Sequence, residues 1–226
     1  MHPLDNPIWL SLTTSHSHFA HVNNCARKFP ATVSMLAAFP EPTAENYASL
    51  ASLLSPDERI GLFLQNPPDP PAGWTVRHSV PLFQMVCEKP ASDETRSNEA
   101  EIIPLTKADV PEMVALTKLT KPGPFDVRTH EMGDYIGIRS AGYLVAMAGE
   151  RLRVPGFTEV SAVCTHPKHL GHGYATLLMK TLMKSICSRG DTPCLHVRSE
   201  NARAVQLYER LGFRTRISLQ YAGMNR

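Results

Sequence analysis

A short loop with two glycines, set between an apolar strand-like segment and a helix, constrains the fold of this 226-residue chain more than any other feature. The segment Val163–Ala175 reads Val-Cys-Thr-His-Pro-Lys-His-Leu-Gly-His-Gly-Tyr-Ala, and a helix is predicted over Thr176–Ser188. Gly171 and Gly173 allow the backbone to turn sharply and to bring successive N–H groups close to a bound group. The first N–H groups of a helix lack partners inside it, and the helix dipole favours negative charge there. The loop therefore predicts an anion site, most often one for phosphate.

A second block lies downstream, separated from the first by a helix and a strand. It spans Asn201–Phe213 and reads Asn-Ala-Arg-Ala-Val-Gln-Leu-Tyr-Glu-Arg-Leu-Gly-Phe. The two blocks together resemble the GNAT superfamily of acyl-CoA-dependent N-acyltransferases, and the resemblance covers roughly Glu101–Arg226. In that family the first block, Gln/Arg-x-x-Gly-x-Gly/Ala, wraps the pyrophosphate of coenzyme A. The family's Gln or Arg falls on Leu170 here, so one side-chain contact to phosphate is lost while the backbone N–H groups remain.

The resemblance implies acetyl-CoA as the cofactor and assigns residues to it. In the family, the strand before the loop splays from its neighbour and pairs with the pantetheine amides. That role falls here to Ala162–Thr165, and the N–H of Val163 or a neighbour would polarise the thioester carbonyl. The Asn and Tyr of the second block face the pantetheine arm and the thioester. The cofactor-binding residues implied are Val163, Cys164, Thr165, His169, Leu170, Gly171, His172, Gly173, Tyr174, Ala175, Thr176, Asn201, Ala204 and Tyr208.

Two residues of the second block have both a functional and a structural interpretation. By resemblance, Tyr208 is the candidate proton donor to the departing thiolate. Its spacing from Ala204 and Leu211 also fits an aromatic ring that packs the helix onto the sheet. Asn201 is a favoured helix N-cap, and it can cap the helix and face the cofactor at the same time.

For the general base, the candidate is Glu159, near the start of the strand before the loop, where some family members place a catalytic glutamate. Strand alternation places Glu159, Ser161 and Val163 on one face, which would direct the carboxylate toward the cleft. The alternative is an edge glutamate in solvent. Glu150 is the reserve candidate, and many GNAT enzymes deprotonate the amine through ordered water without a single essential base.

Histidines and cysteines invite metal or nucleophile hypotheses that their spacing does not support. His166, His169 and His172 recur every third residue on a loop, and no Cys or carboxylate is spaced to complete a zinc site, so no metal is expected. Cys164 has no paired histidine at a recognised spacing and is interpreted as packing. His16 and His18 would share one face of a strand, with a role at the surface or at a pocket rim.

Charge and cysteine content narrow the class of protein. Residues 101–226 hold 17 of the 23 Lys and Arg residues and 11 of the 21 Asp and Glu residues, which fits an anionic cofactor or a nucleic acid. No basic run or aromatic-interleaved basic stripe occurs, so nucleic acid is not expected. The five scattered cysteines indicate reduced thiols in a cytoplasmic protein. No signal pattern and no apolar run of membrane-spanning length is found.

Composition also suggests a division of the chain. Residues 91–100 are polar and without periodicity, and they are interpreted as a linker. Residues 1–90 would form a smaller α/β region, either a degenerate GNAT-like half or a lid that shapes the acceptor pocket. Residues 101–226 would form the GNAT domain.

The expected fold is α/β, with a mixed, mostly antiparallel sheet flanked by helices. Strands are expected at Phe19–Val22, Thr75–Val80, Phe83–Cys87, Glu101–Leu105, Tyr135–Arg139, Tyr143–Gly149, Phe157–Thr165, Cys194–Val197 and Arg216–Tyr221, and helices at Glu45–Leu54, Lys107–Leu119, Thr176–Ser188 and Asn201–Leu211.

The leading hypothesis is an N-acetyltransferase that moves an acetyl group from acetyl-CoA to a primary amine of a small molecule or peptide, by direct attack in a ternary complex, as a monomer or homodimer. The alternative is a catalytically silent acyl-CoA-binding or interaction module, motivated by Leu170 and the uncertain base. A dinucleotide enzyme fits less well, because the loop is too short for Gly-x-Gly-x-x-Gly. Acceptor recognition is expected within Lys118–Tyr135, with the Gly123-Pro124-Phe125 turn lining the pocket.

Overall fold

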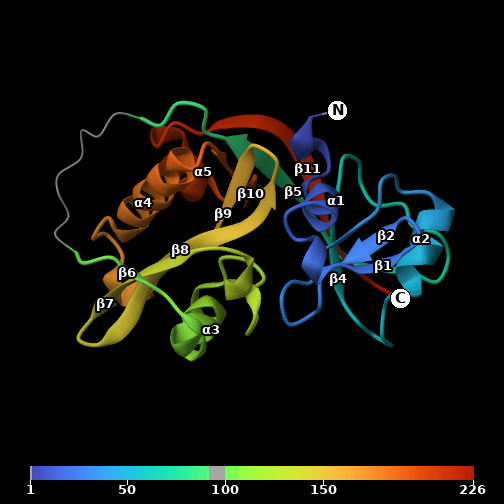
Figure 1. Cartoon of the computed structure of the whole chain (residues 1–226), viewed down its shortest axis with the longest axis horizontal. Coiled ribbons are helices and arrows are strands. Elements are labelled where there is room, and N and C mark those ends of the chain that lie inside the picture. The colour runs from blue at the N-terminus through green and yellow to red at the C-terminus, as the bar shows by residue number, and fades with distance from the viewer. Residues whose placement is uncertain (1, 92–99) are drawn as a thin grey trace.

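The computed structural model describes residues 2–91 and 100–226, which form an eight-stranded sheet, a three-stranded sheet and helices around them (Figure 1). The strands are β1 (His21–Asn23), β2 (Ala26–Lys28), β3 (Ala37–Ala38), β4 (Ile60–Leu64), β5 (Thr75–Val86), β6 (Ile103–Pro104), β7 (Tyr135–Ser140), β8 (Tyr143–Val154), β9 (Phe157–Thr165), β10 (Thr192–Arg198) and β11 (Arg214–Asn225). The helices are α1 (Pro7–Thr13), α2 (Ala44–Ala51), α3 (Val110–Thr120), α4 (Tyr174–Ser188) and α5 (Ala202–Arg210), with 3₁₀ turns at Pro3–Asp5, Ser17–Phe19, Lys107–Asp109, Thr129–Met132 and Pro167–His169.

The large sheet has the strand order β4-β11-β5-β10-β9-β8-β7-β6. β9 and β10 are parallel because α4 connects them as a crossover, while the other neighbours are antiparallel. α3 packs on one face of the sheet and α4 on the other. The mixed, mostly antiparallel sheet with flanking helices that the sequence predicted is confirmed.

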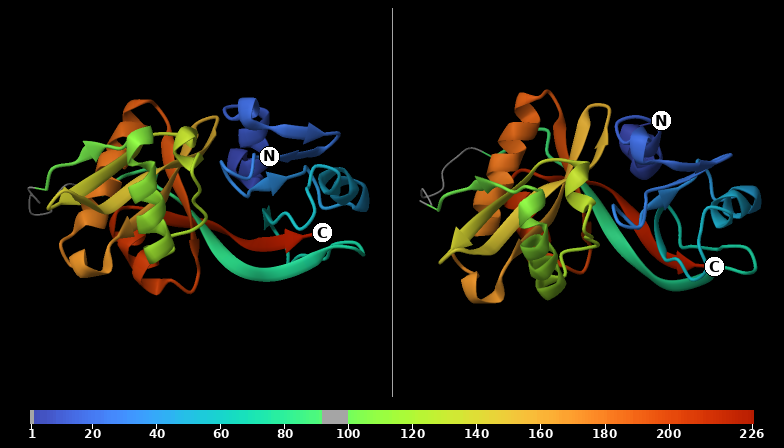
Figure 2. Two further views of the ribbon diagram at one scale, coloured as in Figure 1. Left: turned by 90° about the horizontal axis from the view of Figure 1, so that it is seen from below. Right: turned by 60° about the horizontal axis from the view of Figure 1, so that its bottom comes forward.

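β5 ties the first 90 residues to the rest of the chain. It lies between β10 and β11: Leu82–Val86 pair with Cys194–Arg198 of β10, and the whole strand runs along β11. Figure 2 shows β5 and β11 side by side as two long curved strands that run between the two ends of the molecule. The sequence predicted two strands here. They are one, because Pro81 occupies a ladder position, opposite Gln220, without ending the strand.

The predicted boundary near residue 90 therefore does not coincide with a break in the sheet. Residues 92–99 of the predicted linker lie outside the described residues, and the division of the chain into two regions remains a prediction.

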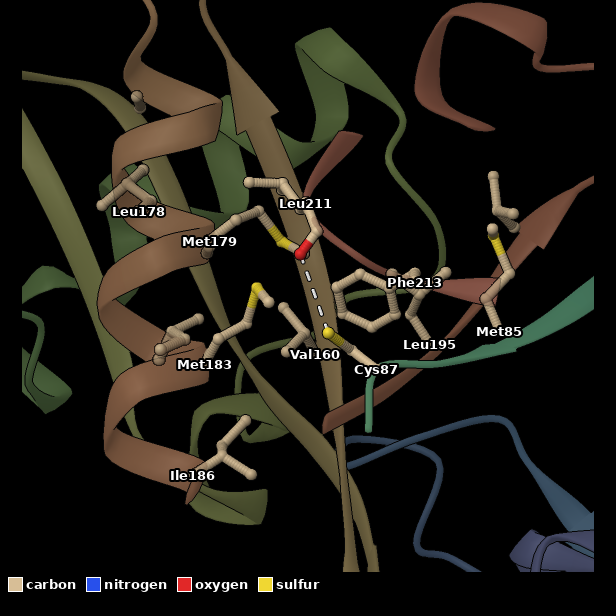
Figure 3. Packing of buried hydrophobic residues seen from close by; sticks show 14 of the residues in the cluster. Met85, Cys87, Val160, Leu178, Met179, Met183, Ile186, Leu195, Leu211 and Phe213 are labelled. Carbon is tan, nitrogen blue, oxygen red and sulfur yellow. Dashed lines mark hydrogen bonds between the residues drawn. The ribbon is translucent and has the colours of Figure 1, made fainter. Parts of the chain in front are cut away.

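The main core lies between α4 and the sheet (Figure 3). α4 presents one apolar stripe with helical spacing, formed by Leu178, Met179, Leu182, Met183 and Ile186, all buried. Met85 of β5 and Phe213, both fully buried, belong to the same core cluster. A residue from the N-terminal part of the chain is thus inside the core of the C-terminal part.

His16 differs most from its predicted setting. It is buried at the start of a 3₁₀ turn and not on a strand, with its ring nitrogens 2.8 Å from Ser11 Oγ and 2.9 Å from the Met132 carbonyl oxygen. Burial lowers the pKa of His16 to about 4. The predicted role at the surface or a pocket rim is therefore wrong: the ring is a neutral, hydrogen-bonded part of the core.

The place of β5 predicts that residues 101–226 cannot fold alone, since the fragment would leave β10 and β11 without the strand between them. We expect the fragment to lack a cooperative thermal transition in circular dichroism, with the full chain as control. A cooperative transition near the melting temperature of the full chain would contradict this role of β5.

His16 predicts an acid-sensitive fold. The unfolded chain takes up a proton near pH 6.5, whereas the folded chain stays neutral at His16 until about pH 4, so stability falls as the pH decreases through this window. We expect His16 to account for a loss of about 2 kcal/mol in the free energy of unfolding between pH 7 and pH 4.5. Urea titrations of His16→Gln should show a correspondingly weaker pH dependence. An unchanged pH dependence in His16→Gln would contradict this role of His16.

Candidate active site

The central feature of the site is the divergence of β9 from β10. The two strands pair at three positions, Phe157 with Thr192, Thr158 with Pro193 and Glu159 with Cys194, and then separate. β10 keeps its ladder with β5 through Arg198, and β9 keeps its ladder with β8. The facing backbone edges beyond Glu159 are therefore open to a ligand, which is the splay that the family resemblance implied.

A bulge in β9 lies where the strands separate. Ala162 has φ of 53°, in the left-handed region that non-glycine residues rarely adopt, and the register with β8 shifts between Ser161 and Cys164. As a result Val163 packs against the same core cluster as Val160, on the α4 side, while Cys164 packs on the α3 side. The expectation that Val163 shares a face with Glu159 is wrong, because the bulge interrupts the alternation.

A cavity of about 220 Å³ opens at this divergence. Residues from β9, β10, α5 and the turn after α3 line it, together with residues from β4, β5, β8 and β11. They are Phe63, Val80, Leu82, Pro122, Gly123, Pro124, Arg151, Val160, Ser161, Ala162, Val163, Leu195, His196, Val197, Arg198, Asn201, Ala204, Tyr208 and Tyr221. The structure thus brings together Val163, Asn201, Ala204 and Tyr208 from the two sequence blocks. Gly123 and Pro124 of the predicted acceptor turn line the same cavity.

Tyr208 and Asn201 both face the cavity from α5. Burial raises the pKa of Tyr208 to about 12, so its phenol keeps its proton at neutral pH. Its ring also packs 6.0 Å from that of Phe213, centroid to centroid. Asn201 Oδ1 accepts a hydrogen bond of 3.2 Å from the Ala204 N–H and caps α5. Tyr208 therefore packs against Phe213 and Asn201 caps α5, and both residues also border the cavity.

The glycine loop lies at the end of β9, outside the lining of this cavity. Gly171 and Gly173 have φ of 86° and 75°, so both glycines occupy the left-handed region as the loop interpretation requires. α4 begins at Tyr174, two residues earlier than predicted, and no side chain from the described residues caps its first turn. Leu170 is 48% exposed. An exposed helix N-terminus without a side-chain cap fits the predicted anion site.

The histidines of the loop form a row of rings. His166 and His169 lie 5.7 Å apart, His169 and His172 6.4 Å apart, and His172 stacks on Tyr174 at 5.5 Å, all measured between centroids. His166 Nδ1 accepts a hydrogen bond from the Lys168 N–H. Within residues 2–91 and 100–226, no group of three His, Cys, Asp or Glu side chains is arranged to hold a metal ion.

Glu159 is a structural ion pair and is not placed to act as a base. Its carboxylate is buried and accepts hydrogen bonds from Arg151 Nε (2.9 Å) and Nη2 (2.6 Å), and His196 Nδ1 lies 2.7 Å away. Burial alone would raise its pKa, but Arg151 and His196 outweigh this effect and hold the pKa far below its usual range. The prediction that Glu159 is the general base is therefore corrected. A carboxylate that stays ionised and already accepts hydrogen bonds from its neighbours is a weak proton acceptor.

Glu150 and Cys164 also have structural roles, Glu150 in ion pairs and Cys164 in the core. Glu150 is buried and receives hydrogen bonds from Arg153 and Arg189. Burial raises the pKa of Cys164 to about 11, which keeps the thiol protonated and a poor nucleophile.

Arg151 and His196 are cavity residues that the sequence reasoning missed. Arg151 lies between Glu150 and Leu152 on a strand whose sequence is typical of one arm of a β-hairpin and carries no catalytic motif. A signal was present, since Arg151 and Glu159 lie four residues before and after Pro155 of the hairpin turn, and that symmetry brings them close together. His196 had no comparable signal, because its partners come from β5 and β9.

Comparisons with known proteins agree with this geometry. The family model described as FR47-like protein matches residues 135–222. A crystal structure from Novosphingobium aromaticivorans, described as an acetyltransferase from the GNAT family, matches 100% of this chain and 99% of its own, with a TM-score of 0.91 and 37% sequence identity. The chain belongs to the GNAT family of acetyltransferases.

Two further relatives match either a shorter part of the chain or the whole chain at lower identity. The N-alpha-acetyltransferase RimI of Mycobacterium tuberculosis is 39% identical over 82 residues, which are 35% of this chain and 51% of RimI, so the match spans about half the length of that relative. A GCN5-related N-acetyltransferase from Kribbella flavida covers 96% of this chain and 95% of its own at 16% identity, with a TM-score of 0.63, and shares the fold. None of the described helices of this GNAT protein is long and apolar enough to cross a membrane.

The loop geometry predicts that charge at Gly173 controls binding of coenzyme A. We expect Gly173→Glu to weaken binding of acetyl-CoA at least about tenfold more than Gly173→Gln, since both carry the same strain at φ of 75° and only Glu repels a pyrophosphate. Calorimetric titration of both variants measures the difference. Leu170→Arg, which restores the family's basic residue, should tighten binding; equal affinities for the Glu and Gln variants would place the pyrophosphate elsewhere.

Proposed function

We propose that this protein is an acetyl-CoA-dependent N-acetyltransferase that acetylates a primary amine by direct attack in a ternary complex. The observation that carries the proposal is the cavity at the divergence of β9 and β10, which is bordered by Tyr208 and Asn201 and followed along the chain by the exposed N-terminus of α4. Membership of the GNAT family and the activity named for RimI support the same reaction class.

The cofactor would be held by the backbone more than by side chains. The N–H groups of Gly171–Thr176 would receive the pyrophosphate, and the open edge of β9 at Ala162–Thr165 would pair with the pantetheine amides. This arrangement fits a chain with Leu170 in place of a basic residue. It would leave the thioester beside the bulge at Ala162, with the N–H of Val163 as the donor to the carbonyl oxygen.

Tyr208 would act as the acid. The amine nitrogen forms a bond to the acetyl carbon, the carbon–sulfur bond breaks, and the departing thiolate takes the phenolic proton. A phenol whose pKa is raised to about 12 by burial stays protonated until the thiolate develops.

No carboxylate among the described residues lines the cavity, and Glu159 is held in its ion pair. We therefore infer that the amine loses its proton to water. This scheme requires no side chain as the base, as in the many family members that use ordered water.

The proposal is tested by incubating the protein with acetyl-CoA and a panel of amines and measuring the free thiol that is released. Tyr208→Phe should lower kcat by about 10²-fold while the dissociation constant for acetyl-CoA changes little, because the acid acts in the transition state. The exposed Tyr143, changed to Phe, is the matched control and should keep wild-type kcat.

Two results would count against this scheme. Full activity of Tyr208→Phe would reduce Tyr208 to its packing role against Phe213. Saturable binding of acetyl-CoA without transfer to any amine would instead favour the catalytically silent acyl-CoA-binding module.

A further inference from the structure

The cavity has an uneven charge that the proposed acetyl transfer does not explain. Arg151, Arg198 and His196 line it, and no Asp or Glu of the described residues does. A simple cationic amine or a polyamine would bring positive charge toward two guanidinium groups without a carboxylate to receive it. The cavity is therefore unsuited to a plain amine and suited to an acceptor that carries negative charge.

Arg151 is the more constrained of the two arginines. Its side chain is 10% exposed, and its Nε and Nη2 both bond to Glu159, so the guanidinium plane is fixed by a two-point contact. Its Nη1 makes no hydrogen bond to any residue within 2–91 and 100–226. By contrast, the Arg198 side chain is 58% exposed and bonds Glu200 at 3.5 Å.

A row of hydrogen bonds across the sheet fixes the state of this ion pair. Arg216, which can only donate, bonds Gln84 Oε1 at 2.8 Å, so the amide nitrogen of Gln84 must point the other way. That nitrogen donates to the Leu4 carbonyl oxygen at 2.8 Å and lies 3.0 Å from His196 Nε2. His196 Nε2 is therefore an acceptor, and the ring proton is on Nδ1, facing Glu159 at 2.7 Å.

Two consequences follow from this polarity. The lone pair of His196 is already used by Gln84, so His196 is not free to take a proton from an amine. Glu159 receives donors from both His196 and Arg151, so it stays ionised and holds Arg151 in one orientation. The row continues past Arg216 to Asp5, so the first residues of the chain support the guanidinium in the cavity.

We propose that the acceptor is a small amine that carries a carboxylate, such as a free amino acid, and that Arg151 is the specificity-determining residue that binds this carboxylate through Nη1. This inference rests on the proposed acetyl transfer and specifies its substrate class. The cavity of about 220 Å³ is smaller than ordinary ligand pockets of about 300–1,000 Å³, which favours a small acceptor. A peptide N-terminus would bring no carboxylate near its amine, so Arg151 Nη1 would lack a hydrogen-bond acceptor.

Matched acceptor pairs test the proposal on the wild-type enzyme. Amino acids and their carboxamides, such as glycine and glycinamide or phenylalanine and phenylalaninamide, share the amine and the side chain and differ in the carboxylate. We expect kcat/KM at least about tenfold higher for the amino acid of the preferred pair, the factor for a charge-assisted contact. Equal or lower kcat/KM for the amino acids, with transfer to the amides intact, would overturn the inference and leave the acetyl transfer standing.

Arg151→Lys tests the residue, since it keeps a positive charge beside Glu159 and loses the fork geometry. KM for the amino acid should rise at least about tenfold, while kcat/KM for the carboxamide changes less than about threefold. Arg153→Lys, on the same strand and outside the cavity lining, is the matched control. Retained binding of acetyl-CoA shows that each variant is folded, and an unchanged preference in Arg151→Lys would remove Arg151 from the acceptor site.

If no amine is acetylated, the proposed function fails and the carboxylate site is still measurable by binding. Calorimetric titration of the CoA-loaded protein with N-acetylphenylalanine and N-acetylphenylalaninamide should then show at least about tenfold tighter binding of the acid, lost in Arg151→Lys. Equal binding of the two, or binding of neither, would overturn the carboxylate site.

Discussion

The pairing of β5 between β10 and β11 is the constraint on which the site depends. A strand that leaves its neighbour exposes N–H and C=O groups, and such a separation is tolerated where the other edge of the strand stays paired. β10 separates from β9 after Cys194, but it remains bonded to β5 through Arg198. The cavity between β9 and β10 is thus held open by a strand from the first 90 residues.

The same strand links the charge of the cavity to the start of the chain. Gln84 of β5 lies between His196 and Arg216, and each bond in the row dictates the polarity of the next. A buried ion pair such as Arg151 with Glu159 costs desolvation free energy, which its hydrogen bonds must offset. Here the carboxylate accepts hydrogen bonds from Arg151 and lies beside His196, while Arg151, which lines the cavity, has one nitrogen without a hydrogen bond within residues 2–91 and 100–226. Such an arrangement is suited to binding an anion.

Local patterns predicted the elements that build the cofactor side of the site. β9 has the bounds expected from its apolar run, and α4 begins within two residues of its expected start, because two glycines and an apolar helical stripe act through neighbouring residues. The predicted cap at Asn201 is also present. The errors concern side chains with a partner distant in sequence: Glu159 and His16 were interpreted as accessible, and both have a hydrogen-bond partner from another segment, 37 and 116 residues away.

The sequence by itself determined the family, the glycine loop with its helix, and the Asn and Tyr that border the cavity, because each of these depends on short-range spacing. The tertiary structure decided the rest. It placed β5 inside the sheet, turned Val163 away from Glu159 through the bulge at Ala162, and converted the expected base into the partner of Arg151. The physical reason is that burial and pairing set the charge state and the accessibility of a side chain, and both depend on strands that meet only in the folded sheet.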